Sequence, residues 1–154
     1  MDLSPFPRAS LTQLPTPIEP LPRLSAHLGG PRLYVKRDDL TGLGLGGNKL
    51  RKLEFLLGEA RAQGADTVLT VGAMQSNHAR QTAAACARLG FDCELILRRG
   101  SHATDAYLNG GNVLLDRLFG AQLHVLEAHE SREARMAARA ESLRGEGRRP
   151  YCIP

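Results

Sequence analysis

The lysines are the residues of this sequence whose type and spacing first suggest chemistry. The chain contains 20 lysine and arginine residues, of which only Lys36, Lys49 and Lys52 are lysines. A lysine amine can lose its proton and attack a carbonyl carbon, whereas an arginine guanidinium stays protonated. Lys49 directly follows the run Gly46-Gly47-Asn48, at the end of a glycine-rich turn. Lys49 is therefore the strongest candidate for a nucleophile.

Residues 49–63 are predicted to form a helix that presents two lysines on one side. At helical spacing, Lys49, Lys52 and Leu56 share one stripe, while leucines and Ala60 share another. A neighbouring cation and the positive end of the helix dipole disfavour the charged form of Lys49. The glycines let the backbone approach a planar ligand, and free N–H groups of the first turn suit a phosphate. The alternative interpretation is a glycine turn before a helix with a solvated basic face.

A second polar turn, residues 72–80, opens another predicted helix. Ser76 or Asn77 occupies the N-cap position. The backbone N–H groups of Asn77, His78 and Ala79 are expected to be free to hold a carboxylate. The alternative is that Ser76 or Asn77 only caps the helix, and His78 alone is more typical of a helix start than of a catalytic base.

Strands and helices alternate along the rest of the chain. Strands are expected at residues 67–71, 93–97, 122–126 and 151–153, helices at 49–63, 77–89, 112–119 and 130–144, and a loop from 98 to 111. Strands separated by such helices run parallel and are joined by right-handed crossovers. This predicts an α/β fold with an open, parallel, twisted sheet covered by helices. In such sheets ligands bind beyond the carboxyl ends of the strands, which is where residues 72–80 lie.

The N-terminal part of the chain follows a different pattern. Residues 1–32 are rich in proline, which excludes a long helix and predicts an extended arm that lies over another surface. A short strand is expected at 33–37 and an irregular glycine-rich loop at 38–48. The glycines of residues 42–47 do not have the spacing of a dinucleotide-binding fingerprint, and no strand of adequate length immediately precedes them. An NAD-binding domain is therefore excluded.

Composition narrows the class of protein. With 154 residues, of which 42% are hydrophobic, the chain can bury roughly two thirds of its unfolded surface around its own core. The net charge of +4 is spread along the chain and aromatic residues are few, which argues against a nucleic-acid partner. Cys86, Cys93 and Cys152 lack disulfide or metal-site spacing and are predicted to be reduced thiols of a cytoplasmic protein. No apolar run approaches the roughly 18 residues of a membrane span.

Two long motifs occur in order in this sequence. The first comprises Lys36-Arg37-Asp38-Asp39 and Gly46-Gly47-Asn48-Lys49-Leu50-Arg51-Lys52-Leu53-Glu54-Phe55, the second comprises Gln75-Ser76-Asn77-His78-Ala79-Arg80-Gln81-Thr82-Ala83, and Pro15-Thr16-Pro17 and Gly111-Asn112 accompany them. With these motifs the whole chain resembles the D-cysteine desulfhydrase and 1-aminocyclopropane-1-carboxylate deaminase family. These are pyridoxal-phosphate enzymes of fold type II, the tryptophan-synthase-β type. The resemblance implies pyridoxal 5'-phosphate as the cofactor.

The resemblance also implies a role for each site residue. Lys49 matches the lysine that holds pyridoxal phosphate as a Schiff base and later moves the α-proton of the substrate. Lys52 matches a lysine near the cofactor phosphate, and Asn77 matches the asparagine placed against the pyridine 3-oxygen. Ser76 matches a serine with a catalytic or substrate-contacting role. The amides around Ser76, Asn77 and His78 match the cradle for the substrate carboxylate.

The activity implied is β-elimination from a small amino acid, with D-cysteine giving pyruvate, ammonia and hydrogen sulfide. Ring opening of 1-aminocyclopropane-1-carboxylate is the alternative, but deaminases with this motif tend to carry glutamine where this chain has His78. Family members continue well past Pro154 and are expected to be homodimers. Residues 1–50 are then the arm and Schiff-base loop of a larger domain whose remainder is missing, and residues 51–154 form the small domain. A third hypothesis is that these 154 residues alone are catalytically inert.

Overall fold

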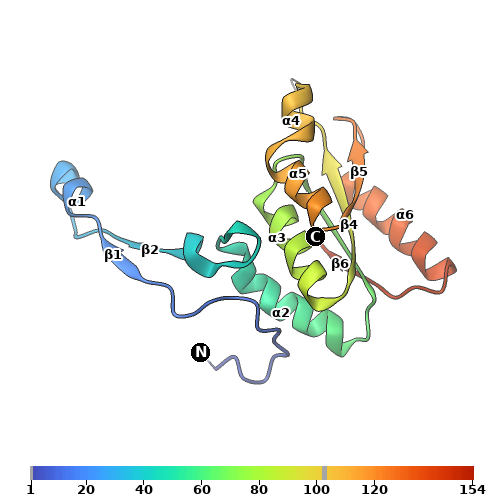
Figure 1. Cartoon of the computed structure of the whole chain (residues 1–154), viewed down its shortest axis with the longest axis horizontal. Coiled ribbons are helices and arrows are strands. Elements are labelled where there is room, and N and C mark those ends of the chain that lie inside the picture. The colour runs from blue at the N-terminus through green and yellow to red at the C-terminus, as the bar shows by residue number, and fades with distance from the viewer. Residues whose placement is uncertain (1, 102–103) are drawn as a thin grey trace.

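A four-stranded parallel sheet forms the centre of the molecule. The computed structural model describes residues 2–101 and 104–154 (Figure 1). The sheet has the order β5-β4-β3-β6, formed by β3 (Thr67–Ala73), β4 (Asp92–Arg98), β5 (Gln122–Leu126) and β6 (Pro150–Ile153). Thr67 pairs with Asp92 on β4 and with Pro150 on β6, in parallel register on both sides. The predicted parallel α/β sheet is confirmed.

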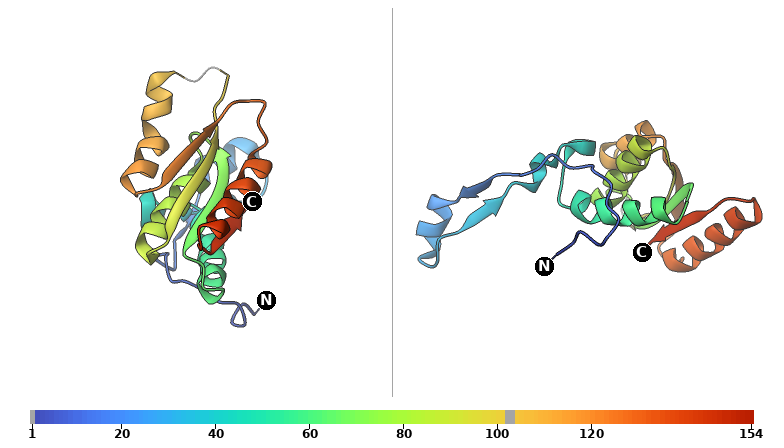
Figure 2. Two further views of the ribbon diagram at one scale, coloured as in Figure 1. Left: turned by 90° about the vertical axis from the view of Figure 1, so that its right-hand side faces the viewer. Right: turned by 90° about the horizontal axis from the view of Figure 1, so that it is seen from below.

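Helices cover both faces of this sheet because its strands are apolar on both sides. Val68, Leu95 and Leu97 face α2 (Lys49–Ala62), α3 (Asn77–Leu89) and α5 (Gly111–Leu118). Leu69 and Ile96 face the opposite way and pack against α6 (Arg132–Gly145). Figure 2 shows α5 (orange) and α6 (red) on opposite sides of the strands. In the part of the chain that the structure describes, none of the helices is long and apolar enough to cross a membrane.

Most predicted elements lie within a few residues of their expected positions, but one loop was predicted wrongly. The segment 98–111, of which residues 102 and 103 lie outside the described part of the chain, contains a short helix, α4 (Asp105–Asn109), that was not predicted. Its N-cap is Thr104, whose side chain accepts a hydrogen bond from the N–H of Tyr107. The helix is only five residues long and buries none of its side chains, so it lacks the apolar stripe by which helices are recognised.

The proline-rich segment is not uniformly extended. It carries strand β1 (Ile18–Pro20) and helix α1 (Pro22–Leu28), and β1 pairs antiparallel with β2 (Tyr34–Lys36), which is the short strand expected at 33–37. A short helix is possible here because Pro22 occupies its first turn, where a missing N–H costs nothing. This unit projects away from the main sheet (Figure 1). The predicted loop at 38–48 also contains two short 3-10 helices, η1 (Asp38–Thr41) and η2 (Leu43–Leu45).

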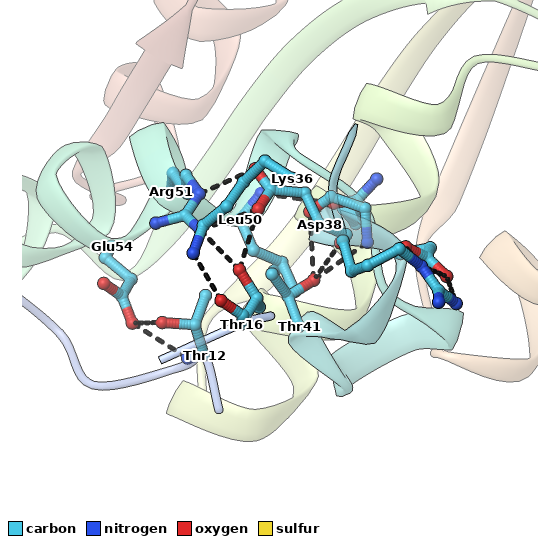
Figure 3. A network of polar contacts seen from close by, with 12 residues as sticks. Thr12, Thr16, Lys36, Asp38, Thr41, Leu50, Arg51 and Glu54 are labelled. Atoms are coloured by element: carbon cyan, nitrogen blue, oxygen red, sulfur yellow. Dashed lines mark hydrogen bonds and ion pairs between the residues drawn. The ribbon is translucent and has the colours of Figure 1, made fainter. Parts of the chain in front are cut away.

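Polar contacts attach the N-terminal segment to α2 (Figure 3). The carboxylate of Glu54, whose side chain is only 2% exposed, accepts hydrogen bonds from the N–H groups of Leu11 and Thr12 at 2.9 and 2.8 Å. Burial opposes the charge on Glu54, but these hydrogen bonds, with those from the Thr12 hydroxyl and Arg8, outweigh it and lower the pKa of Glu54. One turn earlier, Arg51 binds Asp38 at 2.6 Å. The start of α2 is therefore fixed between this segment and the core.

Candidate functional site

Lys49 is the first residue of α2, and its helix opening is not capped by its own sequence. Asn48 precedes the helix but makes no side-chain cap. Instead, the N–H of Leu50 donates to the side-chain Oε1 of Gln81 on α3 at 3.1 Å. The Lys49 amine contacts Asn48 Oδ1 at 3.2 Å. A residue 31 positions away therefore fixes the point where the candidate nucleophile emerges.

The glycine loop before Lys49 is held by its backbone. Gly46 has φ 70° and ψ 177°, a conformation that only glycine adopts readily. A Cβ placed there would lie 1.9 Å from the carbonyl oxygen of Asp39. The Gly46 carbonyl accepts a hydrogen bond from Nη2 of the buried Arg80 at 2.9 Å, and the N–H of Gly47 donates to the Thr41 hydroxyl at 2.9 Å. Glycine is therefore needed at residue 46 for the close approach of two backbone segments.

A buried carboxyl group, that of Asp116, lies near Arg80 behind this loop. Asp116 on α5 is fully buried, and both of its carboxylate oxygens are without a hydrogen-bond partner among residues 2–101 and 104–154. Burial raises the pKa of Asp116 to about 7, and the positive charge of Arg80 acts in the opposite direction. Burial likewise lowers the pKa of Arg80. The sequence analysis did not single out either residue.

The second predicted turn opens α3, and Ser76 is its N-cap. The Ser76 hydroxyl oxygen accepts from the N–H of Ala79 at 3.2 Å. The prediction of three free N–H groups was therefore wrong for Ala79, because the cap uses it. The N–H groups of Asn77 and His78 have no partner within the described part of the chain, since they lie in the first helical turn. Two open donors remain at this helix end for an anionic ligand group.

His78 is a neutral residue with a defined tautomer. Its Nε2 lies 3.1 Å from the hydroxyl oxygen of Thr70, and that hydroxyl donates its only proton to the carbonyl oxygen of Ile153 at 2.9 Å. Nε2 must therefore carry the hydrogen, and the buried Nδ1 is a lone-pair acceptor that none of the described residues satisfies. Burial, followed by the nearby charges of Lys52 and Lys49, lowers the pKa of His78 to about 4.

The two lysines lie near each other and near His78. Burial and then the charge of Lys49 lower the pKa of Lys52. Both lysines also act electrostatically on His78, which places the start of α2 beside the start of α3. That the two ammonium groups point the same way stays a prediction. The roles of Lys52 toward a phosphate and of Ser76 in catalysis stay predictions.

One side chain connects the two helix openings. Gln81 accepts from the N–H of Leu50 and donates through Nε2 to the carbonyl oxygen of Asn77 at 3.0 Å. Gln81 was not predicted as a site residue. Its signal was a polar side chain in the middle of a helix rich in alanine, one turn after Asn77. Gln81 is only 1% exposed, and its two hydrogen bonds fix the start of α2, where Lys49 lies, relative to Asn77 at the start of α3.

The comparison with known proteins identifies the family. The family described as pyridoxal-phosphate dependent enzyme matches residues 9–154. The chain belongs to this family. It is 53% identical over 154 residues to a putative 1-aminocyclopropane-1-carboxylate deaminase of Pyrococcus abyssi, covering 99% of this chain and 44% of that protein. It is 48% identical over 153 residues to a D-cysteine desulfhydrase of Salmonella paratyphi B, covering 99% of this chain and 46% of that protein.

Solved structures agree with this assignment. The crystal structure of an ACC deaminase homologue superimposes with a TM-score of 0.88 at 48% identity, over 99% of this chain and 45% of the other. O-ureido-L-serine synthase, at 19% identity, shares the fold with a TM-score of 0.64 over 88% of this chain and 40% of that one. The chain thus spans about half the length of the relatives it matches.

The donor groups of this site suit the family's cofactor. Pyridoxal phosphate carries an aldehyde, which a lysine amine can bind, and anionic oxygens, which N–H groups can hold. The described residues offer the Lys49 amine beside a glycine backbone, and the open N–H groups of Asn77 and His78. His78 is neutral and brings no charge of its own near pH 7. The site therefore combines a nucleophilic amine with hydrogen-bond donors, which is the combination that an aldehyde with anionic oxygens requires.

Proposed function

We propose that the chain supplies the Schiff-base lysine and part of the substrate site of an enzyme that eliminates a β-substituent from a small amino acid such as D-cysteine. D-cysteine and one water molecule give pyruvate, ammonia and hydrogen sulfide. The main support for the proposal is that the Gln81 side chain hydrogen-bonds both to the first turn of the helix that Lys49 begins and to the backbone of Asn77. These bonds keep the candidate nucleophile and the second polar turn at a fixed relative position. When bound, pyridoxal phosphate supplies the electron sink that stabilises negative charge at the substrate α-carbon.

In this proposal the site residues of the chain have separate tasks. Lys49 would hold the cofactor through its aldehyde carbon and, once the substrate amine has displaced the lysine amine, that free amine would take the proton from the substrate α-carbon. Lys52 places its charge near the cofactor phosphate, and the Asn77 amide donates to the oxygen at position 3 of the ring. The N–H groups of Asn77 and His78 hold the substrate carboxylate, and the Ser76 hydroxyl, which can still donate, contacts the substrate.

A second reaction is supported by a separate observation. The Pyrococcus protein, whose name refers to 1-aminocyclopropane-1-carboxylate deaminase, has the higher identity of the two relatives, 53% against 48%. Opening of that ring uses the same nucleophile and the same carboxylate cradle. His78, which stands where such deaminases tend to carry glutamine, favours the desulfhydrase reaction.

The proposed enzyme is longer than these 154 residues, and the rest of its site lies in the other part. Residues 1–50 join a larger domain of a longer, cytoplasmic, homodimeric protein, and residues 51–154 form its smaller domain. Because positioning groups contribute a large share of catalysis, the 154-residue chain alone is expected to bind the cofactor weakly and to turn over negligibly.

Covalent labelling of the chain tests the role of Lys49. The chain is incubated with pyridoxal phosphate, reduced with borohydride and mapped by mass spectrometry. Label is expected at Lys49 in preference to Lys52 and Lys36, and Lys49→Ala should remove it. Lys36→Ala is the matched control, because Lys36 lies on β2 and donates to the Thr16 carbonyl. Equal labelling of all three lysines, or labelling unchanged by Lys49→Ala, would overturn the proposal.

The choice between substrates is tested in the longer protein that contains this chain. Sulfide release from D-cysteine and ketone formation from 1-aminocyclopropane-1-carboxylate are measured side by side. The first activity is expected to dominate, and His78→Gln is expected to shift the ratio toward the second. Turnover of the cyclopropane acid without any sulfide release from D-cysteine would replace the first reaction by the alternative.

A further inference from the structure

We propose that Asn112, the second residue of α5, is a positioning residue that sets which end of the Asn77 amide faces the ligand. The side-chain Nδ2 of Asn112 donates to Asn77 Oδ1 at 3.0 Å. The NH2 group of Asn77 has no hydrogen-bond partner among the described residues and is therefore the end that can act on a ligand. The identity of that ligand rests on the proposed function, whereas the orientation of the amide does not.

The orientation of the Asn112 amide is fixed by an atom that can only accept. Nδ2 of Asn112 lies 2.9 Å from the backbone carbonyl oxygen of Gln75. A carbonyl oxygen has no hydrogen, so the nitrogen end of the Asn112 amide must face it. The second hydrogen on the same nitrogen then points to Asn77. The atom of Asn77 that receives this hydrogen must be its oxygen, because the nitrogen of an amide does not accept.

Asn112 itself is held in place by the side chain of Gln75. The N–H of Asn112 donates to Gln75 Oε1 at 2.8 Å. The other end of that amide, Nε2, donates to the backbone carbonyls of Tyr107 and Gly110 at 2.6 and 3.1 Å. These two carbonyls fix the Gln75 amide in turn. The whole network is therefore oriented by backbone atoms and has one consistent arrangement.

The close packing at the start of α5 supports the same arrangement. Gly111 has φ +57°, and a Cβ there would lie 2.5 Å from Gln75 Oε1. Gln75 thus packs directly on the backbone at the opening of α5, one residue before Asn112. The turn that precedes Ser76 and Asn77 is consequently tied to α5 by a side chain at each end.

As a consequence, the Asn77 amide presents its NH2 end, and not its oxygen, to the ligand. An amide that presents NH2 stabilises an anionic oxygen, such as the 3-oxygen of pyridoxal phosphate, whereas the same amide turned over presents its own oxygen and repels it. Asn112→Asp is expected to cause this reversal, because a carboxylate only accepts and draws the Asn77 NH2 toward itself. Asn112→Ala should leave the Asn77 amide free to rotate.

The orientation is tested without any cofactor by side-chain amide hydrogen exchange, measured by NMR on the chain. In the wild-type chain both Nδ2 hydrogens of Asn112 are bonded and should exchange slowly, while those of Asn77 should exchange at the solvent rate. In Asn112→Asp the Asn77 hydrogens should become protected. Rapid exchange at Asn112, or protection at Asn77 in the wild-type chain, overturns the inference even if the variant fails to fold.

The effect on the ligand is tested by titrating pyridoxal phosphate into the wild-type and variant chains. Asn112→Asp is expected to weaken binding by about tenfold or more, and Asn112→Ala by less, as for loss of one charge-assisted hydrogen bond. Asn109→Asp is the matched control, because Asn109 lies on α4 and its side chain bonds to Asp105 and Arg117 rather than to Asn77. Unchanged affinity in a folded Asn112→Asp chain overturns the ligand role. If the wild-type chain binds no pyridoxal phosphate, the proposed function fails, while the exchange measurement still decides the orientation.

Discussion

The two helix openings of the candidate site are built in different ways. The start of α3 is capped locally, because the Ser76 hydroxyl accepts from Ala79 three residues later. The start of α2 has no such cap and depends on Gln81, which reaches it from α3. The glycine loop before Lys49 depends on α3 as well, through Arg80 and the Gly46 carbonyl.

This difference shows that the position of the candidate nucleophile is a property of two helices rather than of its own motif. The Ser76–Asn77 turn should survive changes in α2. The Lys49 turn should respond to changes in its loop and in α3. Single substitutions at each opening can therefore separate the two.

Gly46→Ala should disrupt the α2 opening most strongly. The added Cβ would lie 1.9 Å from a backbone oxygen, at a φ of +70° that strains any other residue. We expect a loss of about 3 kcal/mol or more in the free energy of unfolding, measured by urea denaturation. Gly30→Ala is the matched control, because nothing lies within 4 Å of a Cβ there. Similar unfolding midpoints for both variants would show that the loop conformation is not required.

Arg80→Met should loosen the same loop from behind. Methionine keeps an apolar stem but cannot donate to the Gly46 carbonyl, so a buried acceptor is left unsatisfied. A loss of about 2–3 kcal/mol is expected, as for a hydrogen bond from a charged group. Backbone hydrogen exchange should rise at Gly46 and Gly47 but not at Ala79. An equal rise in exchange at Ala79 would show that the starts of α2 and α3 do not respond independently to this substitution.

Gln81→Leu and Ser76→Ala form a matched pair. Each removes a capping group and is expected to cost about 1–2 kcal/mol. Gln81→Leu should increase hydrogen exchange at the Leu50 N–H and reduce borohydride labelling of Lys49. Ser76→Ala should increase exchange at Ala79 and leave the Leu50 N–H protected. Equal effects of both variants on Leu50 would contradict the distinction between a local cap and a tertiary one.

The smallest net effect is expected in the pH dependence of stability of the wild-type chain, because Asp116 and His78 act on it with opposite sign and largely cancel. Asp116 has its pKa raised to about 7 in the folded chain, against an ordinary value of about 4, so its contribution to stability is lost as the pH rises between these values. His78 has its pKa lowered to about 4, against an ordinary value of about 6.5, so its contribution is gained as the pH rises over that range. The two slopes oppose each other between about pH 4 and 6.5.

Single variants separate these slopes. Relative to the wild-type chain, the free energy of unfolding of Asp116→Asn should rise with pH over this window, and that of His78→Asn should fall. Chemical denaturation at a series of pH values gives both curves. If both differences from the wild-type chain changed with pH in the same direction, the assignment of a protonated Asp116 and a neutral His78 would be wrong.

Local signals in the sequence predicted much of the fold. Helix α3 begins at Asn77 and ends at Leu89, as expected, because Ser76 caps its start and Gly90 adopts the left-handed conformation at its end. The parallel order of strands followed from their alternation with helices. Helix α4 was missed because it has no buried face, and α1 was missed because prolines surround it. Both are short helices that depend on a few residues at their ends.

Local signals were enough to predict Lys49, Ser76, Asn77 and His78 at two helix openings, since caps and periodicity act over a few residues. Tertiary packing was needed to bring Gln81 to the helix of Lys49, Arg80 to the Gly46 carbonyl, and Asn112 to Asn77. These partners are separated by 31 to 35 residues along the chain. A hydrogen bond depends on distance and direction in space, so such pairs are set only when packing brings α2, α3 and α5 together on one face of the sheet.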